Sequence, residues 1–489
     1  MKEESWSIEK LLFFLFFKQL CNKEKNVSSF SIDTSDRERL VSAFKQYYFS
    51  ASLKEKEELI SAFSNLETSL KLLFTSQVLR FEKDYNSLNQ LVSKIKQWEE
   101  AEVKAITDDL IELFLRVNGE LLLNIASIWK NMDSIPNSLL NKLIEFLKDR
   151  DQFIQRKAMY LFHILGPETI PFLLSSLLLP NTRGVQNVRS VILKFSKKAI
   201  PYLRKALSLK NPFLKVEAVK LLGELKASEA EEDIKALLPL ARSSNYFLQA
   251  VLLSLGKIAG KSSLQLLKSF LKHSDIKIVE SALDGLAESG CKEAWEILRE
   301  LFESETTPAE IKLIIISNLK YFKDKEVASF LWDLIQTDVP VLFKREALFA
   351  LAKSSSVSLR EKALEFALED CAEEMRLAAI EIIVMNSDKK WINKLKGLFY
   401  SAKERKMKLA LIRAFGKMKD KQVLPLLLPL LKEEDKIIKI NVILAVKEIK
   451  DVLALPFLKN ILKEESSEEL RSLLKSAIRY ISREYYKLH

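Results

Sequence analysis

Basic side chains recur at one position of a long-range pattern, and they are the residues that could most readily bind a charged ligand. Each is separated from the next by about 32 residues or a multiple of that interval; they are Lys215, Lys312, Lys344, Arg376, Lys408, Lys439 and Arg471. An acid or amide stands four residues earlier in some units, as with Asn211, Glu404 and Asp435. Such a column can pair internally or bind an external anion, and exposed ion pairs contribute only about 0.2–1 kcal/mol each.

A second concentration of positive charge lies near the C-terminus. Residues 391–489 contain 22 Lys and Arg against 12 Asp and Glu, whereas the whole chain has a net charge of +11. The candidate binding residues of this segment are Lys403, Arg405, Lys406, Lys408, Arg413, Lys417, Lys419 and Lys421. A basic face attracts acidic protein, nucleic acid or anionic lipid, so we expect any polyanion binding to reside here. A solvated lysine-rich face without a ligand is the alternative interpretation.

Residue types that support catalysis are few and scattered. The chain has only three histidines and three cysteines, namely His163, His273, His489, Cys21, Cys291 and Cys371. Their spacing fits neither a histidine triad nor a metal site, and the sequence has no Gly-rich phosphate loop or nucleophile elbow. We therefore predict no catalytic, cofactor or metal site and expect that the protein is not an enzyme. The sparse, odd cysteine count is typical of a reducing compartment, so a cytoplasmic protein is expected.

The elements that must position these charges follow a repeating apolar pattern. Eleven small or aliphatic residues, here called anchors, recur every 30–33 residues: Ala158, Val188, Ala218, Val251, Ala282, Ile315, Ala347, Ala379, Leu411, Val442 and Leu474. A period in this range indicates stacked repeat units, each packing on its neighbours.

Each unit is predicted to be a pair of helices. The clearest pair spans residues 423–431 and 437–449, separated by a polar turn. First helices often begin with proline, which suits a first helical turn, whereas Pro239 and Pro429 fall inside first helices and should kink them. With 10 glycines and 12 prolines in 489 residues, the composition favours an all-α fold.

The N-terminal region, residues 1–117, is predicted to be helical but does not follow this period. Amphipathic helices are expected at 37–49, 54–66, 69–81 and 88–98, as a helical cap or as degenerate repeats. Residues 11–17 form the most apolar run, which is too short to span a bilayer and lacks signal-peptide features. A buried capping helix is expected there, with a membrane or partner anchor as the alternative. No transmembrane segment is predicted.

The pattern of the units resembles HEAT repeats, particularly the short bacterial type found in phycobilisome lyases. A proline-led first helix, an acidic turn, a basic residue, paired small residues and a Leu-Gly end carry this resemblance from Leu139 to Tyr486. A further unit is expected around Ala126, so the repeat domain is placed at 118–489. The resemblance implies an α-solenoid of about 11–12 repeats with second helices on its concave side. It also implies that the basic column is a structural ladder between neighbouring units.

Several functions occur in proteins of this type. Deoxyhypusine hydroxylases bind iron through His-Glu pairs, and this sequence contains no His-Glu dipeptide. The resemblance implies a non-enzymatic scaffold or adaptor that binds a protein partner on its concave surface or its basic C-terminal face. One alternative is a nucleic-acid-binding protein similar to the HEAT-like DNA glycosylases, using the basic C-terminal third. The other is a lyase-like enzyme subunit acting with a partner.

Overall fold

The computed structural model describes residues 34–488 apart from 64–65, 67, 179–181, 354–355 and 371. Every regular element of this described part is a helix, which confirms the all-α prediction. The apolar run at 11–17 lies outside it. The chain divides into two compact units, Met1–Pro239 and Leu240–His489, each of which is described by itself. The predicted boundary at 117/118 is a different division and stays a prediction.

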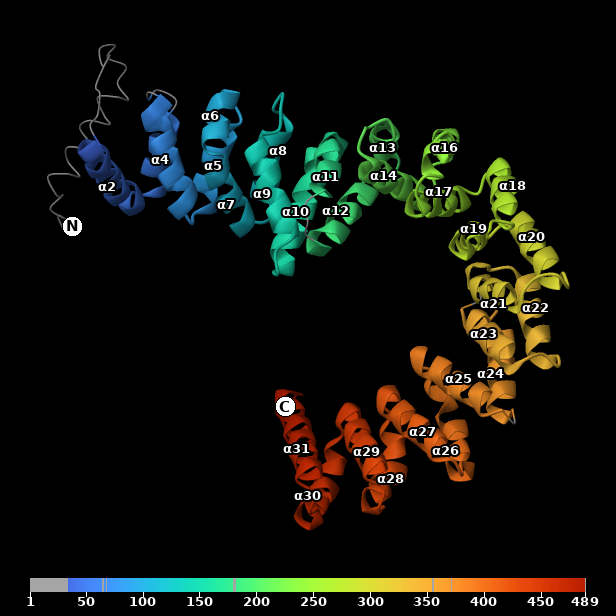
Figure 1. Ribbon diagram of the computed structural model, residues 1–489. Helices are drawn as coiled ribbons and strands as arrows, with labels where there is room; N and C mark the ends of the chain where they lie inside the picture. Colours follow the sequence, from blue (N-terminus) through green and yellow to red (C-terminus); the bar gives the residue numbers. More distant parts are fainter. Residues whose placement is uncertain are drawn as a thin grey trace. The chain divides into compact units, whose positions relative to one another are not determined.

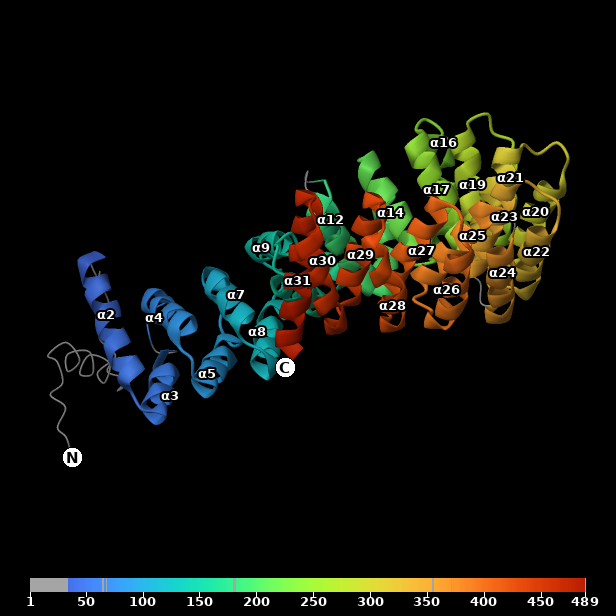
Figure 2. The same cartoon turned by 90° about the horizontal axis from the view of Figure 1, so that it is seen from below.

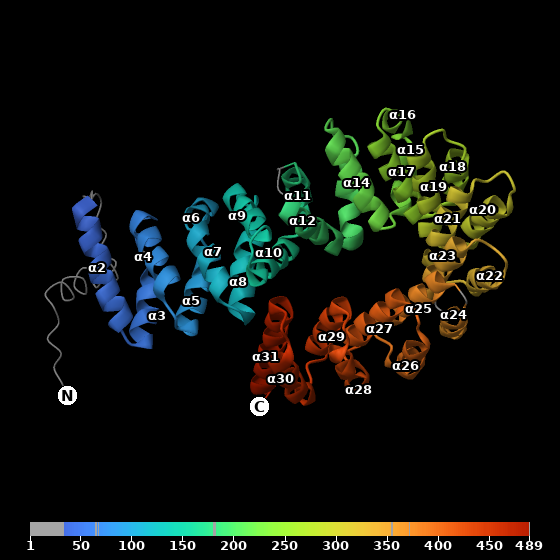
Figure 3. The same ribbon diagram turned by 60° about the horizontal axis from the view of Figure 1, so that its bottom comes forward.

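The first unit is a stack of helices in two rows. Its α-helices are α2 (Thr34–Ser50), α3 (Leu53–Ala62), α4 (Thr68–Phe81), α5 (Tyr85–Ile95), α6 (Glu100–Ala105), α7 (Thr107–Arg116), α8 (Gly119–Lys130), α9 (Asn137–Leu147), α10 (Gln152–Leu165), α11 (Ile170–Ser176), α12 (Thr182–Lys194), α13 (Ile200–Ala206), α14 (Pro212–Glu224) and α15 (Glu231–Lys235). One row runs α2, α4, α7, α9, α11, α13 and the other α3, α5, α8, α10, α12, α14 (Figures 1, 2 and 3). The four helices expected near the N-terminus correspond to α2–α5, and both rows continue through residue 117.

The second unit repeats this pairing more regularly. Its α-helices are α17 (Asn245–Ile258), α18 (Lys261–Phe270), α19 (Ile276–Ser289), α20 (Lys292–Glu303), α21 (Ala309–Asn318), α22 (Lys325–Gln336), α23 (Val341–Ala352), α24 (Val357–Glu369), α25 (Glu373–Met385), α26 (Ile392–Ser401), α27 (Arg405–Met418), α28 (Leu424–Leu427), α29 (Lys436–Ile449), α30 (Leu455–Glu464) and α31 (Glu468–Leu488), with α16 (Leu238–Ala241) at the division. Odd-numbered helices from α17 to α31 form one row of successive neighbours, and the even-numbered helices lie outside it (Figure 1).

Short 3₁₀ segments connect several second helices to the first helices that follow. They are η2 (Pro167–Thr169), η3 (Ser196–Ala199), η4 (Ser228–Ala230), η5 (Leu319–Tyr321), η6 (Lys389–Trp391), η7 (Lys421–Val423) and η9 (Val452–Ala454). Another, η8 (Leu428–Lys432), continues α28 at Pro429, where the α-helix gives way to 3₁₀ geometry. The helix containing Pro239 is likewise broken into α15 and α16, so both prolines interrupt a first helix as expected.

The anchors occupy the core of both units. All eleven lie in second helices, α10, α12, α14 and then each odd-numbered helix from α17 to α31, and none is more than 2% exposed. This confirms the helix-pair solenoid predicted from their spacing. The period therefore records a burial requirement that each second helix meets against its neighbours.

Small residues bring successive second helices of the second unit into backbone contact. A Cβ added at Gly256 of α17 would collide with the backbone of Gly285 in α19. A Cβ at Gly416 of α27 would lie 2.7 Å from Cα of Ala445 in α29. Both glycines lie five residues after an anchor, so a glycine at this position, as in the predicted Leu-Gly end at Gly256, marks a close helix approach.

In most repeats the residue eight positions after an anchor follows the second helix and has a positive φ. The residues with positive φ at this position are Gly166, Ser196, Lys226, Ala259, Gly290, Ser387, Lys419 and Lys450. Glycine is usual at such a site because a Cβ is strained there. The lysines at 419 and 450 place positive charge at the negative ends of the α27 and α29 dipoles.

Charged side chains connect neighbouring helices of the first unit. Lys157 of α10 is 7% exposed and donates to the carbonyls of Phe114, Leu115 and Val117 at 3.0, 2.7 and 2.6 Å. These carbonyls lie at the C-terminus of α7, where the last carbonyl groups of a helix have no N–H donor within the helix itself. Burial lowers the pKa of Lys157. Arg116 similarly donates to the Arg80 carbonyl at 2.6 Å, at the end of α4.

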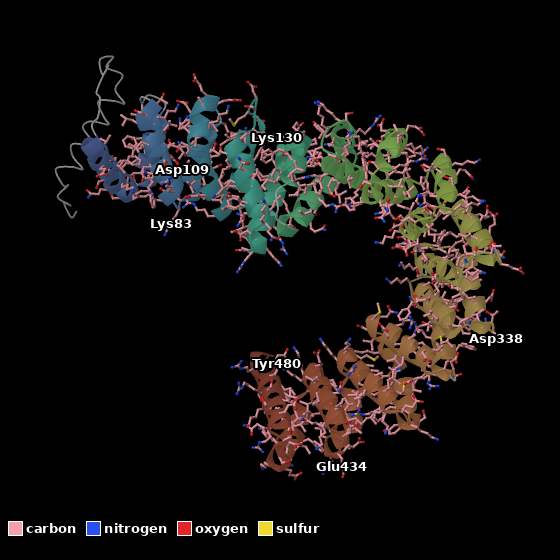
Figure 4. The ribbon with its side chains drawn as sticks, in the orientation of Figure 1. Lys83, Asp109, Lys130, Asp338, Glu434 and Tyr480 are labelled. Atoms are coloured by element: carbon pink, nitrogen blue, oxygen red, sulfur yellow. The ribbon has the colours of Figure 1, made fainter. Side chains whose placement is uncertain are left out.

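Ion pairs add to these contacts near the N-terminus. Arg80 and Asp109 (Asp109 is labelled in Figure 4) join α4 to α7 with Nε and Oδ1 2.5 Å apart. Lys56 of α3 pairs with Glu82, which is 4% exposed, at 2.9 Å. Burial opposes ionisation of Glu82, but hydrogen bonds from the Asp84 and Lys83 amides and from Lys56 outweigh it and lower its pKa. Each tie joins one helix pair to the next.

Candidate functional site: a basic edge of the C-terminal repeats

The eight predicted binding residues are spread along one helix, and all but one lie around its two ends. Lys403, Arg405, Lys406 and Lys408 lie at the start of α27, Arg413 lies in the middle, and Lys417, Lys419 and Lys421 lie at or beyond its end. Since α27 has 14 residues, its ends are about 20 Å apart. The structure therefore does not gather these side chains into one patch, and each end has to be considered separately.

Side chains at the start of α27 pair with acids on the neighbouring second helices. Arg405 contacts the Asp435 carboxylate through Nε and Nη2 at 2.6 and 2.7 Å. This hydrogen-bonded guanidinium lowers the pKa of Asp435 to about 2. Lys406 lies 3.7 Å from Glu373 at the start of α25. These contacts tie successive repeats together, which reduces the charge available to a partner.

Lys421, beyond the end of α27, belongs to another set of inter-repeat contacts. Its ammonium lies 3.2 Å from Asp451, which is 3% exposed and accepts a hydrogen bond from the Leu453 amide. One repeat earlier, Lys389 lies 4.0 Å from Asp420. In these two successive repeats, the lysine after an aspartate N-cap thus reaches the aspartate N-cap of the following repeat.

Of the other predicted residues, Arg413 donates to the Asn441 side-chain oxygen at 2.7 Å. Lys417 and Lys419 of α27 lie with Lys447 and Lys450 of α29 and Arg479 of α31 in what we call the basic edge. They lie at or near the C-terminal ends of α27 and α29 and at the matching level of α31. Within the described part of the chain, Lys417, Lys419 and Arg479 form no ion pair. Counting charge along the sequence does not identify the basic edge, because its residues come from three repeats and are far apart in the sequence.

An aromatic ring and apolar side chains accompany these charges. The Lys447 and Lys450 ammonium groups lie 5.3 and 5.0 Å from the ring centroid of Tyr480 on α31, which is labelled in Figure 4. Lys447 also donates to the Ser476 hydroxyl at 3.3 Å. Tyr480 is 37% exposed, and Leu444 on α29 is 43% exposed. The surface therefore offers both cationic and apolar contacts.

The seven residues of the predicted ladder make several kinds of contact. Arg376 donates to the Asp370 carbonyl at 2.6 Å, and Arg471 to the Leu462 and Glu465 carbonyls at 3.1 and 2.8 Å, so these arginines brace the turn of their own repeat. Lys439 pairs with Glu465 of the next repeat at 3.2 Å.

The pKa of Glu465 is lowered by a hydrogen bond from the Ser467 amide, and also by Lys439. Lys312 lies 5.6 Å from the ring centroid of Phe302. A ladder through all seven positions, with Lys215, Lys344 and Lys408, stays a prediction.

The two described histidines have structural partners. His163 stacks on Phe195 with ring centroids 5.8 Å apart, and Nδ1 of His273 accepts a hydrogen bond from the Asp275 amide. The described residues contain no group of three or more His, Cys, Asp or Glu side chains suited to a metal ion. Within the same residues, no helix combines the length and apolar character required to cross a membrane.

Comparison with known proteins identifies repeats in the segment that carries the basic edge. The family model for HEAT repeats matches residues 392–479, from α26 into α31. No curated protein matches the chain.

Among solved structures, Kap121p is similar with a TM-score of 0.36 and 13% identity, covering 92% of this chain and 53% of that one. Human deoxyhypusine hydroxylase is similar with a TM-score of 0.21 and 14% identity, covering 71% of this chain and 96% of that one. The chain spans about half the length of Kap121p. Residues 392–479 are HEAT repeats, and the resemblance indicated by the spacing of the anchors is thereby confirmed.

Proposed function

We propose that this protein is a non-enzymatic, cytoplasmic scaffold that binds an acidic segment of a protein partner at the basic edge. The observation that carries the proposal is the placement of Lys447 and Lys450 around the half-exposed Tyr480 ring, beside exposed Leu444. Carboxylates of a partner would meet the ammonium groups, and its apolar side chains would cover Leu444 and the ring. Aromatic residues within a polar rim are typical of protein interfaces.

The same features favour protein over nucleic acid as the partner. Phosphate-backbone binding requires positive charge alone, whereas an exposed aliphatic side chain beside the charges, such as Leu444, adds affinity for the apolar side chains of a protein partner. Met385 at the end of α25 is 63% exposed and extends the apolar character to a neighbouring repeat. A nucleic-acid-binding function similar to the HEAT-like glycosylases is the second candidate, supported by the net charge of residues 391–489.

Affinity capture followed by mass spectrometry tests this proposal. The bait is the full chain, and the edge variant combines Lys417→Glu, Lys447→Glu and Lys450→Glu. The control variant combines Lys403→Glu, Lys459→Glu and Lys463→Glu, which are exposed lysines away from the edge with the same change in charge. All samples are treated with nuclease, and circular dichroism verifies that helical content is retained.

We expect wild type and control variant to capture the same protein partner and the edge variant to lose it. Binding should weaken with added salt, because charges at exposed sites are screened. Equal capture by the edge and control variants would contradict the proposal. Loss of every partner after nuclease treatment would favour the nucleic-acid alternative.

A further inference from the structure

A pocket in the second unit is lined by residues of α24, of the end of α25 and of the segment that leads into α26. These three helices are labelled in Figure 1. The volume of the pocket is about 420 Å³, within the range of ligand sites. Leu364, Ile383 and Trp391 are buried and form its apolar part, while Arg360 and Asn386 contribute polar groups. None of these residues belongs to the basic edge.

The acceptors at the rim of this pocket are already occupied by one side chain of the protein. The Lys390 ammonium contacts Glu361 and lies 3.3 Å from Asp388, whose other oxygen accepts the Lys390 amide at 3.3 Å. The same ammonium lies 5.7 Å from the ring centroid of Trp391. An external cation would therefore have to displace Lys390 from two carboxylates and an aromatic ring.

The donors of the pocket, in contrast, lack acceptors. The indole N–H of Trp391 is buried and has no hydrogen-bond partner among the described residues. Within the same part of the chain, the Arg360 guanidinium and the Asn386 side-chain amide, which both line the pocket, form no hydrogen bond or ion pair either. Leaving a buried donor unsatisfied costs about 1–3 kcal/mol, so an acceptor that reaches it is favoured.

We infer that this pocket binds a carboxylate group, with Arg360 as its cationic partner. A guanidinium matches the two oxygens of a carboxylate, and the Trp391 N–H supplies a further donor to the same group. With Lys390 and Arg360 offsetting Glu361 and Asp388, the site is near neutral. A singly charged carboxylate therefore fits better than a phosphate dianion, which the rim carboxylates would repel.

The inference is independent of the proposed scaffold function and is tested with small probes. The full chain is labelled with 5-fluorotryptophan, and among its six tryptophan signals that of residue 391 is identified with Trp391→Phe. Fluorine NMR then follows titration with acetyl-Gly-Glu-Gly-amide, which has a side-chain carboxylate, and with acetyl-Gly-Gly-Gly, which has a terminal one. Acetyl-Gly-Gln-Gly-amide and inorganic phosphate are the comparison probes.

We expect one or both carboxylate peptides to move the Trp391 signal saturably, and the responding peptide shows which source of carboxylate is bound. The glutamine peptide should leave the signal unchanged, and phosphate should bind more weakly. Arg360→Gln should weaken carboxylate binding about tenfold or more, as expected when a charge-assisted contact is lost. The matched variant Lys362→Gln, at an exposed position of the same helix, should bind as wild type does.

The inference is overturned if neither carboxylate moves the Trp391 signal, or if the glutamine peptide or phosphate moves it as strongly. It is also overturned if a folded Arg360→Gln variant binds carboxylate like wild type. Should Arg360→Gln fail to retain helical content, the four wild-type titrations decide the question alone.

Discussion

The N-terminal helices and the C-terminal repeats use different contacts for the same stacking task. Between α4 and α10, charged side chains reach buried partners, as Lys157 does at the end of α7 and Arg80 does at Asp109. Between α17 and α29, glycines let neighbouring backbones touch, as Gly256 does at Gly285. The ion pairs at the start of α27 are exposed additions to that packing. Each charged contact of the N-terminal helices involves a different pair of positions. The close packing of the C-terminal repeats, in contrast, recurs at the same position relative to the anchor.

The largest effect should come from removing the buried ammonium of the N-terminal region. Lys157→Met leaves three carbonyls at the end of α7 without their donor, so we expect a loss of about 3–5 kcal/mol in unfolding free energy. Lys130→Met, at the exposed end of α8 (labelled in Figure 4), should change stability by less than about 0.5 kcal/mol. Urea unfolding of both variants measures the loss of unfolding free energy. Similar losses for the two variants would show that Lys157 does not stabilise the contact between α10 and α7.

The next effect concerns the close packing of the second unit. Gly256→Ala forces α17 and α19 apart, which should destabilise the unit by about 1–3 kcal/mol. Gly397→Ala in α26 places its methyl group in open space and should stabilise by about 0.5–1 kcal/mol through helix propensity. Thermal unfolding of the two variants shows whether each one stabilises or destabilises the protein. A stabilising effect of Gly256→Ala would rule out backbone contact at this site.

A smaller stabilisation is expected where a lysine of the basic edge adopts a left-handed conformation. Lys419 has φ of 53°, so Lys419→Gly should raise the unfolding free energy by about 1 kcal/mol. The same change removes a charge from the edge and should weaken partner binding. Chemical denaturation and a binding assay on one sample test both. Loss of stability would mean that the lysine side chain contributes more to the fold than its strain costs.

Acid should affect both regions through carboxylates whose pKa is lowered in the folded state. Such a group stabilises the fold above its unfolded pKa, and this contribution disappears as pH falls through the folded value. The stability difference between wild type and Glu82→Gln should therefore narrow below about pH 4.5. For Asp435→Asn it should narrow between about pH 4 and the folded pKa of about 2, with a smaller amplitude because this pair is exposed. Differences that stay constant with pH would contradict both assignments.

The contrast between the two regions explains how far the sequence could be interpreted. The anchors repeat, and glycines recur five residues after some of them, because a close helix approach needs a small or fully buried residue at a fixed position of the helix. The solenoid was therefore predictable from the sequence. Lys157 and Glu82 do not recur at such a register, and α7 was not predicted. The candidate site was predictable as a charged segment only. Which of its basic residues are ion-paired and which form the basic edge depends on side chains about 30 residues away in the sequence. Examples are Asp435, which pairs with Arg405, and Tyr480, whose ring lies beside Lys450.

Fluorescence anisotropy with two defined probes tests the central claim, that the basic edge binds protein rather than nucleic acid. One probe is an acetylated, amidated 20-residue peptide with leucines on one helical face and glutamates elsewhere, and the other is a 20-base-pair DNA duplex. We predict that the peptide binds more tightly and that Lys417→Glu, Lys447→Glu and Lys450→Glu together weaken it at least about tenfold. The control reversals at Lys403, Lys459 and Lys463 should leave it unchanged.

For DNA, we predict only non-specific affinity, roughly 10⁻⁴–10⁻⁶ M at physiological salt. Nanomolar, base-dependent binding of the duplex at that salt, or an equal loss of peptide binding in the control variant, would contradict the account.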